Sequence, residues 1–419
     1  MRPRGYIVRM KQNDTLVELT LADVAFGGDA IGRRADGKAV FVPFAMSGER
    51  VRVRIEVDQP RLARGVLLDV LEANPRRALA PCPYYMNCGG CVYQHMEYAA
   101  ELDCKQRQLV ELLHRLGGLD SLPEPEPAYA SPKVYGYRNK LRVEPLTLGV
   151  GPEDKRVGYG YCMRDNVTFF ELASCPLAAE PLNELLPRVQ LTREGRRNAT
   201  RPQPSALTLR LTHDGGTSFF FGRAPRRVPW LREQLLDRPV SVPLGSFWQV
   251  NAEVTGALVR RVAEWFTANP TRTLVDAYSG VGTFSLAIGK SAHARFLIES
   301  DEQALQAAQF NHAQWDGLEC HCRRGTTEAV LPRLLADANL KRTTVLLDPP
   351  RQGCGAPVLK ALCDFPVGQV LYVSCNAATL ARDLKQLVQK GGYRVSRLAL
   401  FDMFPRTAHF ETAVCLNRG

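Results

Sequence analysis

The sequence 274-LVDAYSGVGTFSLAIG-289 has the pattern of a buried strand, a glycine turn and the first turns of a helix. Gly280 and Gly282 allow the backbone to approach a ligand closely, and Glu299 ends the next apolar segment, where an acid typically binds ribose hydroxyls. A dinucleotide fingerprint would need a third glycine where Ser285 stands, so a pyrophosphate ligand is disfavoured. The pattern favours S-adenosylmethionine (SAM), a nucleoside cofactor that brings no phosphate to bind.

Strands and helices alternate from about residue 245 to the end of the chain. The apolar segments TTVLLDPPR, QVLYVSC and FETAVCL supply further strands, and helical sequences lie between them. This alternation predicts a Rossmann-like, doubly wound α/β domain over 245–419, with its ligands at the carboxyl ends of the strands.

Residues 12–75 have the pattern of a small β-barrel. Short runs of alternating apolar and polar residues are separated by turns such as Gly27–Gly28 and Asp36–Gly37. About five short strands of this kind suit a closed OB-like barrel, which is often a nucleic-acid platform. The segments AFGGDAIGR and VFVPFAMSGE resemble the TRAM domain, an RNA-binding barrel. A barrel that only packs against its neighbour is the alternative.

Between these two parts, residues 76–240 are expected to form a central domain rich in β-structure. A helix is predicted over 97–119, ended by Gly117–Gly118, and it could pack on the last domain despite its place in the sequence. Basic runs such as YGYRNKLRV and TREGRRNATR suit either a solvated surface or contacts with phosphate.

The composition points to a cytoplasmic protein with a polyanionic partner. The chain has 419 residues, too many for one core, and its formal charge of +11 favours a nucleic-acid partner over simple solubility. No run of about 18 apolar residues is present, so no membrane span is expected. The first residues lack the apolar core of a signal peptide, and nothing in the sequence requires more than a monomer.

Three residues near the strand ends point to methylation of a pyrimidine carbon. C5 of a pyrimidine is a poor nucleophile until a thiolate adds to C6, and a base must later remove the C5 proton. Cys375 follows the strand QVLYVSC and precedes a helix, whose start is expected to lower the thiol pKa. Glu411 stands beside His409 at the last strand and fits the base. Asp348, held before two prolines, fits a contact beside the methyl group and the base.

These motifs resemble those of the RNA uridine-5-methyltransferase family, in particular its 23S rRNA branch. The likeness covers nearly the whole chain and is carried by DAYSGVGTFSL, DPPRQG, SCNAATLARDL and DMFPRTAHFETAVCL. It implies a class I SAM-dependent methyltransferase domain in which Cys375 is the nucleophile and Glu411 the base. The SAM contacts that it implies are Gln249, Tyr278, Thr283, Glu299, Thr326 and Asp348.

The chain departs from the family pattern at two places. Ser279 stands where the family usually has cysteine, and Ala377 where it usually has proline. Neither position carries a required charge or proton, so we expect only local changes of shape. RNA cytosine-5 enzymes place a cysteine directly after the proline of the fourth motif; Arg351 occupies that place here, so uracil is favoured over cytosine.

A separate group of cysteines suggests a metal centre. Cys82, Cys88 and Cys91 form a C-x5-C-G-G-C pattern in a loop, and Cys175 is a better fourth ligand than Cys104 or Cys162. The spacing alone suits zinc and iron–sulfur equally. The family resemblance implies a [4Fe–4S] cluster on Cys82, Cys88, Cys91 and Cys175, and because methyl transfer moves no electron we interpret it as a structural centre.

Several alternatives stay open at this point. The same chemistry could act on tRNA, since archaeal-type tRNA enzymes share a barrel and a cluster. A SAM-dependent methylase of an exocyclic base nitrogen would not need Cys375. A non-catalytic iron–sulfur protein that binds RNA or transfers electrons would not bind SAM at all.

Overall fold

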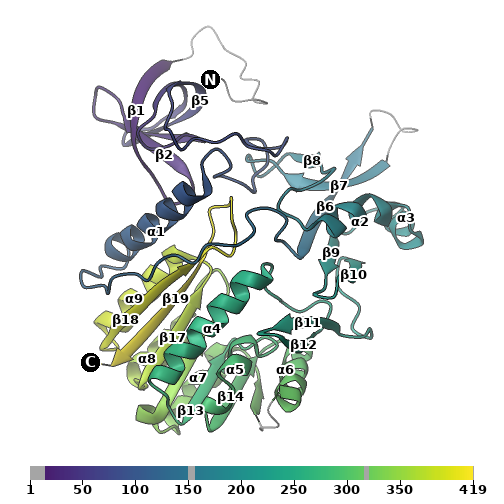
Figure 1. Ribbon diagram of the computed structural model, residues 1–419, viewed down its shortest axis with the longest axis vertical. Coiled ribbons are helices and arrows are strands. Elements are labelled where there is room, and N and C mark those ends of the chain that lie inside the picture. Colours follow the sequence, from purple (N-terminus) through teal and green to yellow (C-terminus); the bar gives the residue numbers. More distant parts are fainter. Residues whose placement is uncertain (1–14, 150–155, 316–319, 419) are drawn as a thin grey trace.

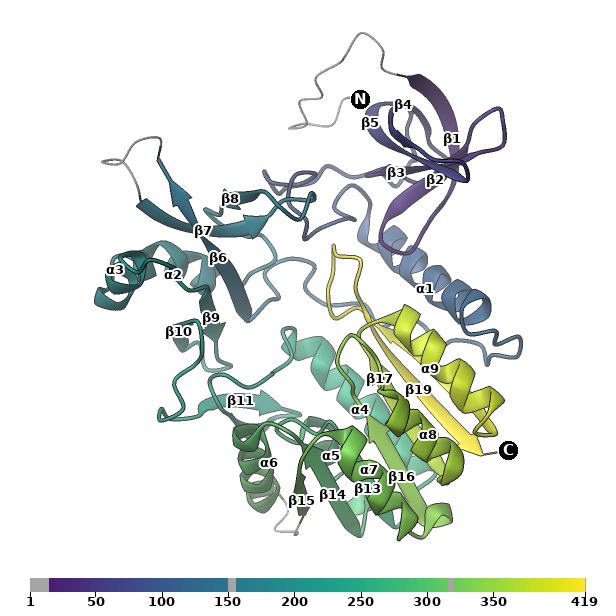
Figure 2. The ribbon, with the colours of Figure 1, turned by 180° about the vertical axis from the view of Figure 1, so that it is seen from behind.

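The computed structural model describes residues 15–149, 156–315 and 320–418. Figures 1 and 2 show a small barrel at one end of the molecule and a large sheet flanked by helices at the other, with the central strands to one side. Residues 12–14 of the expected barrel, 150–155 of the expected central domain, and 316–319 and 419 of the expected last domain lie outside the described residues.

The N-terminal strands close into a five-stranded barrel in the order β1-β2-β3-β5-β4, as the sequence predicts. Alternation of side chains builds its interior: in β3, Val40 and Val42 are fully buried and their neighbours are partly exposed. The strands are β1 (Leu16–Val24), β2 (Asp29–Arg33), β3 (Ala39–Pro43), β4 (Arg50–Asp58) and β5 (Leu62–Glu72).

Helix α1 (Tyr98–Arg115) lies between the barrel and the C-terminal sheet (Figures 1 and 2). On one side, Gln108 Nε2 donates hydrogen bonds to the backbone oxygens of Val24, at 3.0 Å, and Ala25, at 2.8 Å. On the other, Leu109 and Leu113 are fully buried in a hydrophobic cluster shared with the C-terminal helices. The helix therefore joins two parts of the chain that are far apart in sequence.

The central part is a five-stranded sheet in the order β10-β9-β6-β7-β8; α2 packs against it, and α3 is joined to it by a hydrogen bond from Asn198 Nδ2 to Tyr159 Oη. A two-stranded hairpin follows, and its Leu235 and Val240 pack into the same hydrophobic cluster as Trp265 of the C-terminal part. The elements are β6 (Lys140–Leu148), β7 (Arg156–Cys162), β8 (Phe169–Glu171), α2 (Glu180–Gln190), α3 (Arg193–Ala199), β9 (Leu207–Leu211), β10 (Thr217–Phe221), β11 (Leu231–Leu235) and β12 (Arg238–Val242).

The C-terminal part is a seven-stranded sheet in the order β15-β14-β13-β16-β17-β19-β18. Its strands are β13 (Thr273–Ala277), β14 (Ala294–Glu299), β15 (His321–Arg324), β16 (Thr343–Leu347), β17 (Gln369–Ser374), β18 (Tyr393–Phe401) and β19 (Glu411–Arg418). The helices are α4 (Ala252–Ala268), α5 (Thr283–Ile288), α6 (Glu302–Trp315), α7 (Thr327–Ala336), α8 (Ala356–Asp364) and α9 (Ala377–Gln389), with short 3-10 turns at Gly289–Ser291 and Leu340–Arg342.

Two hydrophobic clusters, one on each face of this sheet, confirm the predicted doubly wound arrangement. One cluster contains residues of α4, α5 and α6, and the other contains residues of α7, α8 and α9. Both β16 and β17 are buried throughout, as expected for strands covered on both faces. None of the helices in the described ranges combines the length and the apolar character needed to cross a bilayer.

The direction of β19 decides which residues meet at the carboxyl edge of the sheet. β13, β14, β15, β16 and β17 run parallel, whereas β19 is antiparallel to β17. The first residue of β19 therefore lies at the same edge as the last residues of the parallel strands. Ser374 pairs with Thr412, so Cys375 and Glu411 adjoin this pair, each next to one of its members.

Candidate active site

The turn after β13 is built from residues with left-handed backbones. Tyr278 has φ of 68°, and Gly280 and Gly282 have φ of 55° and 87°. A Cβ on Gly282 would lie 3.2 Å from His312 Nε2, so this glycine is needed both for its φ and for a close approach to α6. The left-handed Tyr278 is strained for a residue with a side chain, and such strain is typical of functional sites.

Glu299, at the end of β14, holds this turn in place. Its Oε2 accepts a 3.0 Å hydrogen bond from Gly280 N, and its Oε1 accepts a 2.7 Å bond from Asp301 N. The backbone oxygen of Glu299 accepts from Gly325 N at 3.0 Å, which brings Thr326 alongside. The structure thus brings Glu299 and Thr326 together with the turn of Tyr278 and Thr283.

Tyr278 links this turn to α7, and Gln249 belongs to a different segment of the chain. Tyr278 Oη donates a 3.1 Å hydrogen bond to Glu328 Oε1 of α7, a contact that the sequence argument did not find. Gln249 is buried in the segment between β12 and α4, where its backbone oxygen accepts a 3.0 Å bond from Asn139 Nδ2.

Two carboxyl groups lie beneath the turn at the ends of β13 and β16. Asp276 is 1% exposed; its Oδ2 accepts a 3.3 Å bond from Ser285 N, and its Oδ1 has no hydrogen-bond partner among the described residues. Burial raises the pKa of Asp276 to about 7. Burial, and then the charge of Asp276, raise the pKa of Asp348 to about 7 as well. This edge of the sheet therefore disfavours additional negative charge.

Cys375 and Glu411 form the second half of the site. Glu411 is 3% exposed, and its Oε2 lacks a hydrogen-bond partner among the described residues. Burial and the charge of Asp348 raise the pKa of Glu411 well above its usual value. Burial, and then the charges of Glu411 and Asp348, raise the pKa of the half-buried Cys375 thiol to about 12.

The pKa of Cys375 corrects one expectation from the sequence. The start of α9 was expected to lower the thiol pKa, but burial and two carboxylates outweigh the helix terminus. Arg351 opposes them, because its charge lowers the pKa of both Cys375 and Glu411. The sequence argument considered Arg351 only as the residue that replaces a second cysteine.

The loop after Asp348 is bound to the start of α9. The backbone oxygen of Arg351 accepts hydrogen bonds from Asn376 Nδ2, at 3.0 Å, and from Thr379 Oγ1, at 3.3 Å. Further along, Asp383 Oδ2 accepts a 2.8 Å bond from Cys354 N. Asp348 and Cys375 are consequently carried by two loops that are fixed to each other.

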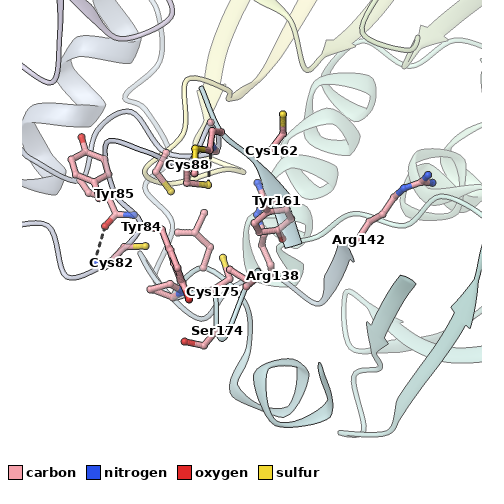
Figure 3. A pocket seen from close by; sticks show the side chains of 18 of the residues that line it. Cys82, Tyr84, Tyr85, Cys88, Arg138, Arg142, Tyr161, Cys162, Ser174 and Cys175 are labelled. Carbon is pink, nitrogen blue, oxygen red and sulfur yellow. Dashed lines mark hydrogen bonds between the residues drawn. The ribbon is translucent and has the colours of Figure 1, made fainter. Parts of the chain in front are cut away.

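The other cysteines line a separate cavity of about 460 Å³ between the loop 82–91 and the central sheet. Figure 3 shows Cys82, Cys88 and Cys175 around this cavity, together with Cys162, which the sequence argument set aside. Three basic residues on alternate positions, Arg138, Lys140 and Arg142, also line it. Cys104 lies in α1, where its sulfur accepts a 3.2 Å bond from Gln108 Nε2.

The thiols at this cavity affect one another. Burial raises the pKa of Cys91 to about 12, and the charges of Cys175, Cys88 and Cys82 add to the effect. Within the described ranges, no three His, Cys, Asp or Glu side chains are grouped closely enough to bind a metal ion as they stand. The donor set, four soft sulfur ligands at one cavity, is nevertheless of the kind that zinc and iron–sulfur clusters require.

Comparisons with known proteins agree with this geometry. The family profile described as tRNA (Uracil-5-)-methyltransferase matches residues 241–419, and the TRAM domain profile matches residues 13–68. A protein of Chromohalobacter salexigens named 23S rRNA (uracil(1939)-C(5))-methyltransferase RlmD is 32% identical, and the match covers 100% of this chain and 92% of that one. The chain belongs to the RNA uracil-5-methyltransferase family. It is accordingly a SAM-dependent RNA uracil-5-methyltransferase with an N-terminal TRAM domain.

Two further relatives of this uracil-5-methyltransferase extend over nearly its whole length. A Nostoc protein named as an uncharacterized RNA methyltransferase is 32% identical over 96% of both chains. The crystal structure of the Pyrococcus abyssi tRNA (uracil-54, C5)-methyltransferase in complex with S-adenosyl-L-homocysteine aligns with a TM-score of 0.70 over 95% of this chain and 99% of that one. At 23% identity, this second likeness supports the fold alone.

Ser279 and Ala377, the two positions at which the sequence was expected to depart from the family pattern, are both internal. Ser279 is 5% exposed, and its Oγ has no hydrogen-bond partner among the described residues. Ala377 is 2% exposed and is the first residue of α9. A buried hydroxyl without a partner costs free energy, so Ser279 carries a local cost in stability.

Proposed function

We propose that the protein methylates C5 of a specific uridine in 23S rRNA, with Cys375 as the nucleophile and Glu411 as the base. The observation that supports this most strongly is the register of β17 and β19, where Ser374 pairs with Thr412. This pairing brings a thiol and a buried carboxyl to one point at the carboxyl edge of the sheet, beside Asp348.

The proposed reaction begins with Cys375. Its thiolate adds to C6 of the uracil, and the displaced electron pair develops as an enolate that makes C5 nucleophilic. SAM, when bound, supplies the methyl group to C5 and leaves as S-adenosylhomocysteine. Glu411 then takes the C5 proton, the C5–C6 double bond forms again, and the bond from C6 to Cys375 Sγ breaks, which returns the thiolate.

The pKa values of Cys375 and Glu411 are both raised, which suits a reaction in which these two groups ionise one after the other. A neutral Glu411 favours the Cys375 thiolate, because the charge of Glu411 raises the thiol pKa. Once the sulfur is bonded to C6 it is uncharged, and Glu411 can then ionise and act as the base. Arg351 lowers both pKa values and so favours each ionised form in its turn.

The SAM site is proposed to lie at the turn after β13. Glu299 would bind the ribose hydroxyls, as acids at the end of the second strand do in nucleotide sites. The remaining proposed contacts are Gln249, Tyr278, Thr283, Thr326 and Asp348. Because Asp276 and Asp348 disfavour additional negative charge, this edge suits the positive sulfonium of SAM better than a phosphate.

We further propose that Cys82, Cys88, Cys91 and Cys175 hold a [4Fe–4S] cluster, which makes 76–240 an iron–sulfur domain. The four sulfurs share one cavity, and bound iron would offset the mutual repulsion of their charges. The cluster would link the loop 82–91 to the central part of the chain through its cysteine ligands, and it would take no part in methyl transfer.

The choice of 23S rRNA rests on the Chromohalobacter relative, which is named for that substrate and matches the whole chain. The Pyrococcus structure is named for uracil 54 of tRNA, so tRNA is the second candidate. Mapping of 5-methyluridine by mass spectrometry in rRNA and tRNA, with and without the gene, separates them. Methyl groups found only in tRNA would overturn the rRNA assignment, and a product on adenine or cytosine nitrogen would overturn both.

Two variants test the covalent route. Cys375→Ala should abolish turnover while SAM binding by calorimetry is kept. Glu411→Gln should accumulate a methylated protein–RNA adduct, seen as a shifted band in a denaturing gel. A Cys375→Ala protein that still produces 5-methyluridine would contradict the proposed mechanism.

A further inference from the structure

A buried ionic network connects α1 to the loop that precedes Glu411. Lys105 Nζ donates to Glu101 Oε1 at 2.6 Å and to Asp402 Oδ1 at 2.7 Å, and all three side chains are fully buried. Asp402 also accepts a 2.8 Å hydrogen bond from Tyr98 Oη. The network therefore joins α1 to the first residue after β18.

Arg406, a residue of this loop, binds α1 and the segment just before it. Its backbone N donates to Glu101 Oε1 at 2.7 Å, and its Nη1 donates to the oxygen of Met96 at 2.8 Å. In return, the oxygen of Arg406 accepts from Val92 N at 2.9 Å and from Tyr93 N at 3.1 Å, directly after Cys91. The loop 402–410 is thus held between α1 and the cysteine-bearing segment.

Figures 1 and 2 show where this loop lies. It projects from the C-terminal sheet, just before β19, into the space between α1 and the central strands. Its last residue, Phe410, packs against Phe26 of the barrel, with ring centroids 6.2 Å apart. The residue that follows is Glu411, whose backbone is placed by its pairing with Phe401 of β18 and by the adjoining β17–β19 ladder. The contacts of the loop with the barrel and with α1 add to this support.

Buried ion pairs contribute little net stability, because desolvation of the charges offsets their attraction. Well-packed apolar side chains of similar volume often replace such pairs with little loss of stability. Charged, hydrogen-bonded groups restrict the loop to one arrangement, because each hydrogen bond has a preferred direction. A general base needs such a geometry, and a displacement of about 1 Å can lower a rate roughly 100-fold.

We propose that Asp402 and Lys105 are positioning residues for the proton-abstraction step, holding the loop 402–410 so that Glu411 faces C5 of the bound uracil. This inference rests on the proposed function and adds that different contacts support the nucleophile and the base. Cys375 shares the β17–β19 ladder with Glu411, but Cys375 and Asp348 are also held by loops fixed to α9, whereas the ionic network holds the loop before Glu411. Loss of the network should slow the last step most.

The test uses the fate of the covalent adduct. Asp402→Asn keeps the shape of the side chain and removes the charge that Lys105 faces. Incubated with SAM and unmodified 23S rRNA transcribed in vitro, this variant should turn over roughly 10- to 100-fold more slowly than the wild type. It should also accumulate at least roughly 10-fold more methylated adduct, because proton abstraction becomes the slow step. SAM affinity should not change.

Glu49→Gln provides a matched control. Glu49 is fully buried and binds Arg77 through two hydrogen bonds of 2.6 and 2.8 Å, in a pair between the barrel and the segment after it. The same loss of a buried charge should therefore lower thermal stability without accumulation of adduct. If Asp402→Asn does not fold, Tyr98→Phe removes one hydrogen bond to Asp402, together with one that Tyr98 accepts from Ser131 N, and should show the same signature more weakly.

Two results would overturn the positioning role: turnover by Asp402→Asn at the wild-type rate, or slow turnover without accumulated adduct. The first shows that the network is dispensable, and the second that it supports folding or RNA binding only. A parallel reaction with Glu411→Gln distinguishes failure of the positioning role from failure of the proposed covalent mechanism. If Glu411→Gln traps adduct and Asp402→Asn does not, only the positioning role fails; if neither does, the proposed mechanism fails with it.

Discussion

Asn376 Nδ2 donates a 3.0 Å hydrogen bond to the backbone oxygen of Arg351, which joins the residue after Cys375 to the loop after Asp348. The same side chain caps α9, because Asn376 Oδ1 accepts a 3.1 Å bond from Ala378 N. One amide therefore has a structural role and a role in arranging the site, and the two can be separated by experiment.

Asn376→Ala should lower turnover far more than its effect on stability would suggest. Loss of a helix cap costs about 1 kcal/mol, whereas loss of the shorter of the two hydrogen bonds that fix the Arg351 oxygen should lower kcat roughly 10-fold or more. Thr192→Ala is the control: Thr192 caps α3 through a 3.0 Å bond from Gly195 N, away from the site. Steady-state kinetics and thermal melts of both variants check this, and equal kinetic effects would contradict it.

The raised pKa of Cys375, about 12, predicts slow alkylation of the free enzyme. Carboxamidomethylation of Cys375 by iodoacetamide, measured by peptide mass spectrometry, should be slow at pH 8 and rise with pH, because only the thiolate reacts. Glu411→Gln removes a charge that raises this pKa and should speed the reaction. Arg351→Met removes a charge that lowers it and should slow the reaction.

Glutathione added to the same reaction is the control, because the rate at which it is alkylated gives the pH dependence expected of an exposed thiol. Alkylation of Cys375 as fast as that of glutathione at pH 8 would show that the thiol is already activated without RNA.

Protein purified without oxygen should contain iron and acid-labile sulfide in equal amounts. Cys91→Ser should lose both, since a serine oxygen is a poor ligand for a cluster. Cys104→Ser is the matched control, because Cys104 is also buried but lies in α1, with its sulfur bonded to Gln108. Metal analysis that finds zinc and no sulfide would assign the centre to zinc.

Much of the site could be predicted from local sequence. Asp276, Glu299, Asp348 and Cys375 each follow an apolar run, and the rule that ligands lie at the carboxyl ends of parallel strands places them at one edge. The confirmed barrel also follows from local patterns, namely the alternation in β3 and the glycine turns.

What the sequence did not predict depends on contacts between distant residues. Lys105 and Asp402 are 297 positions apart, and only the fold shows that they form an ion pair. The pKa of Cys375 was wrong in direction for the same reason: the helix start is local, but Glu411 and Asp348 approach from other strands. Charge effects of this kind cannot be assigned until the neighbours are known.

The two glycines of the turn after β13 should differ in their tolerance of a side chain. Gly282→Ala places a Cβ 3.2 Å from His312 Nε2 at φ of 87°, and should cost roughly 1–3 kcal/mol of stability. Gly280→Ala meets nothing within 4 Å at φ of 55°, a left-handed value that alanine adopts at roughly 1 kcal/mol. Urea unfolding without SAM measures both, and equal losses would contradict the role assigned to His312.

Asp276 should make the protein less stable as pH rises. Its pKa is about 7 in the folded protein and 3.8 as the ordinary value, so between these pH values the folded state holds a proton that the unfolded state has released. Stability then falls as pH rises through this range, because the unfolded state binds fewer protons. Asp276→Asn should match the wild type near pH 4 and exceed it by roughly 2–4 kcal/mol at pH 8. Urea titrations across this range measure the difference, and Asp337→Asn, which removes the same formal charge at an exposed position, controls for net charge. A constant difference between Asp276→Asn and wild type at every pH would show that the carboxyl is already ionised in the fold.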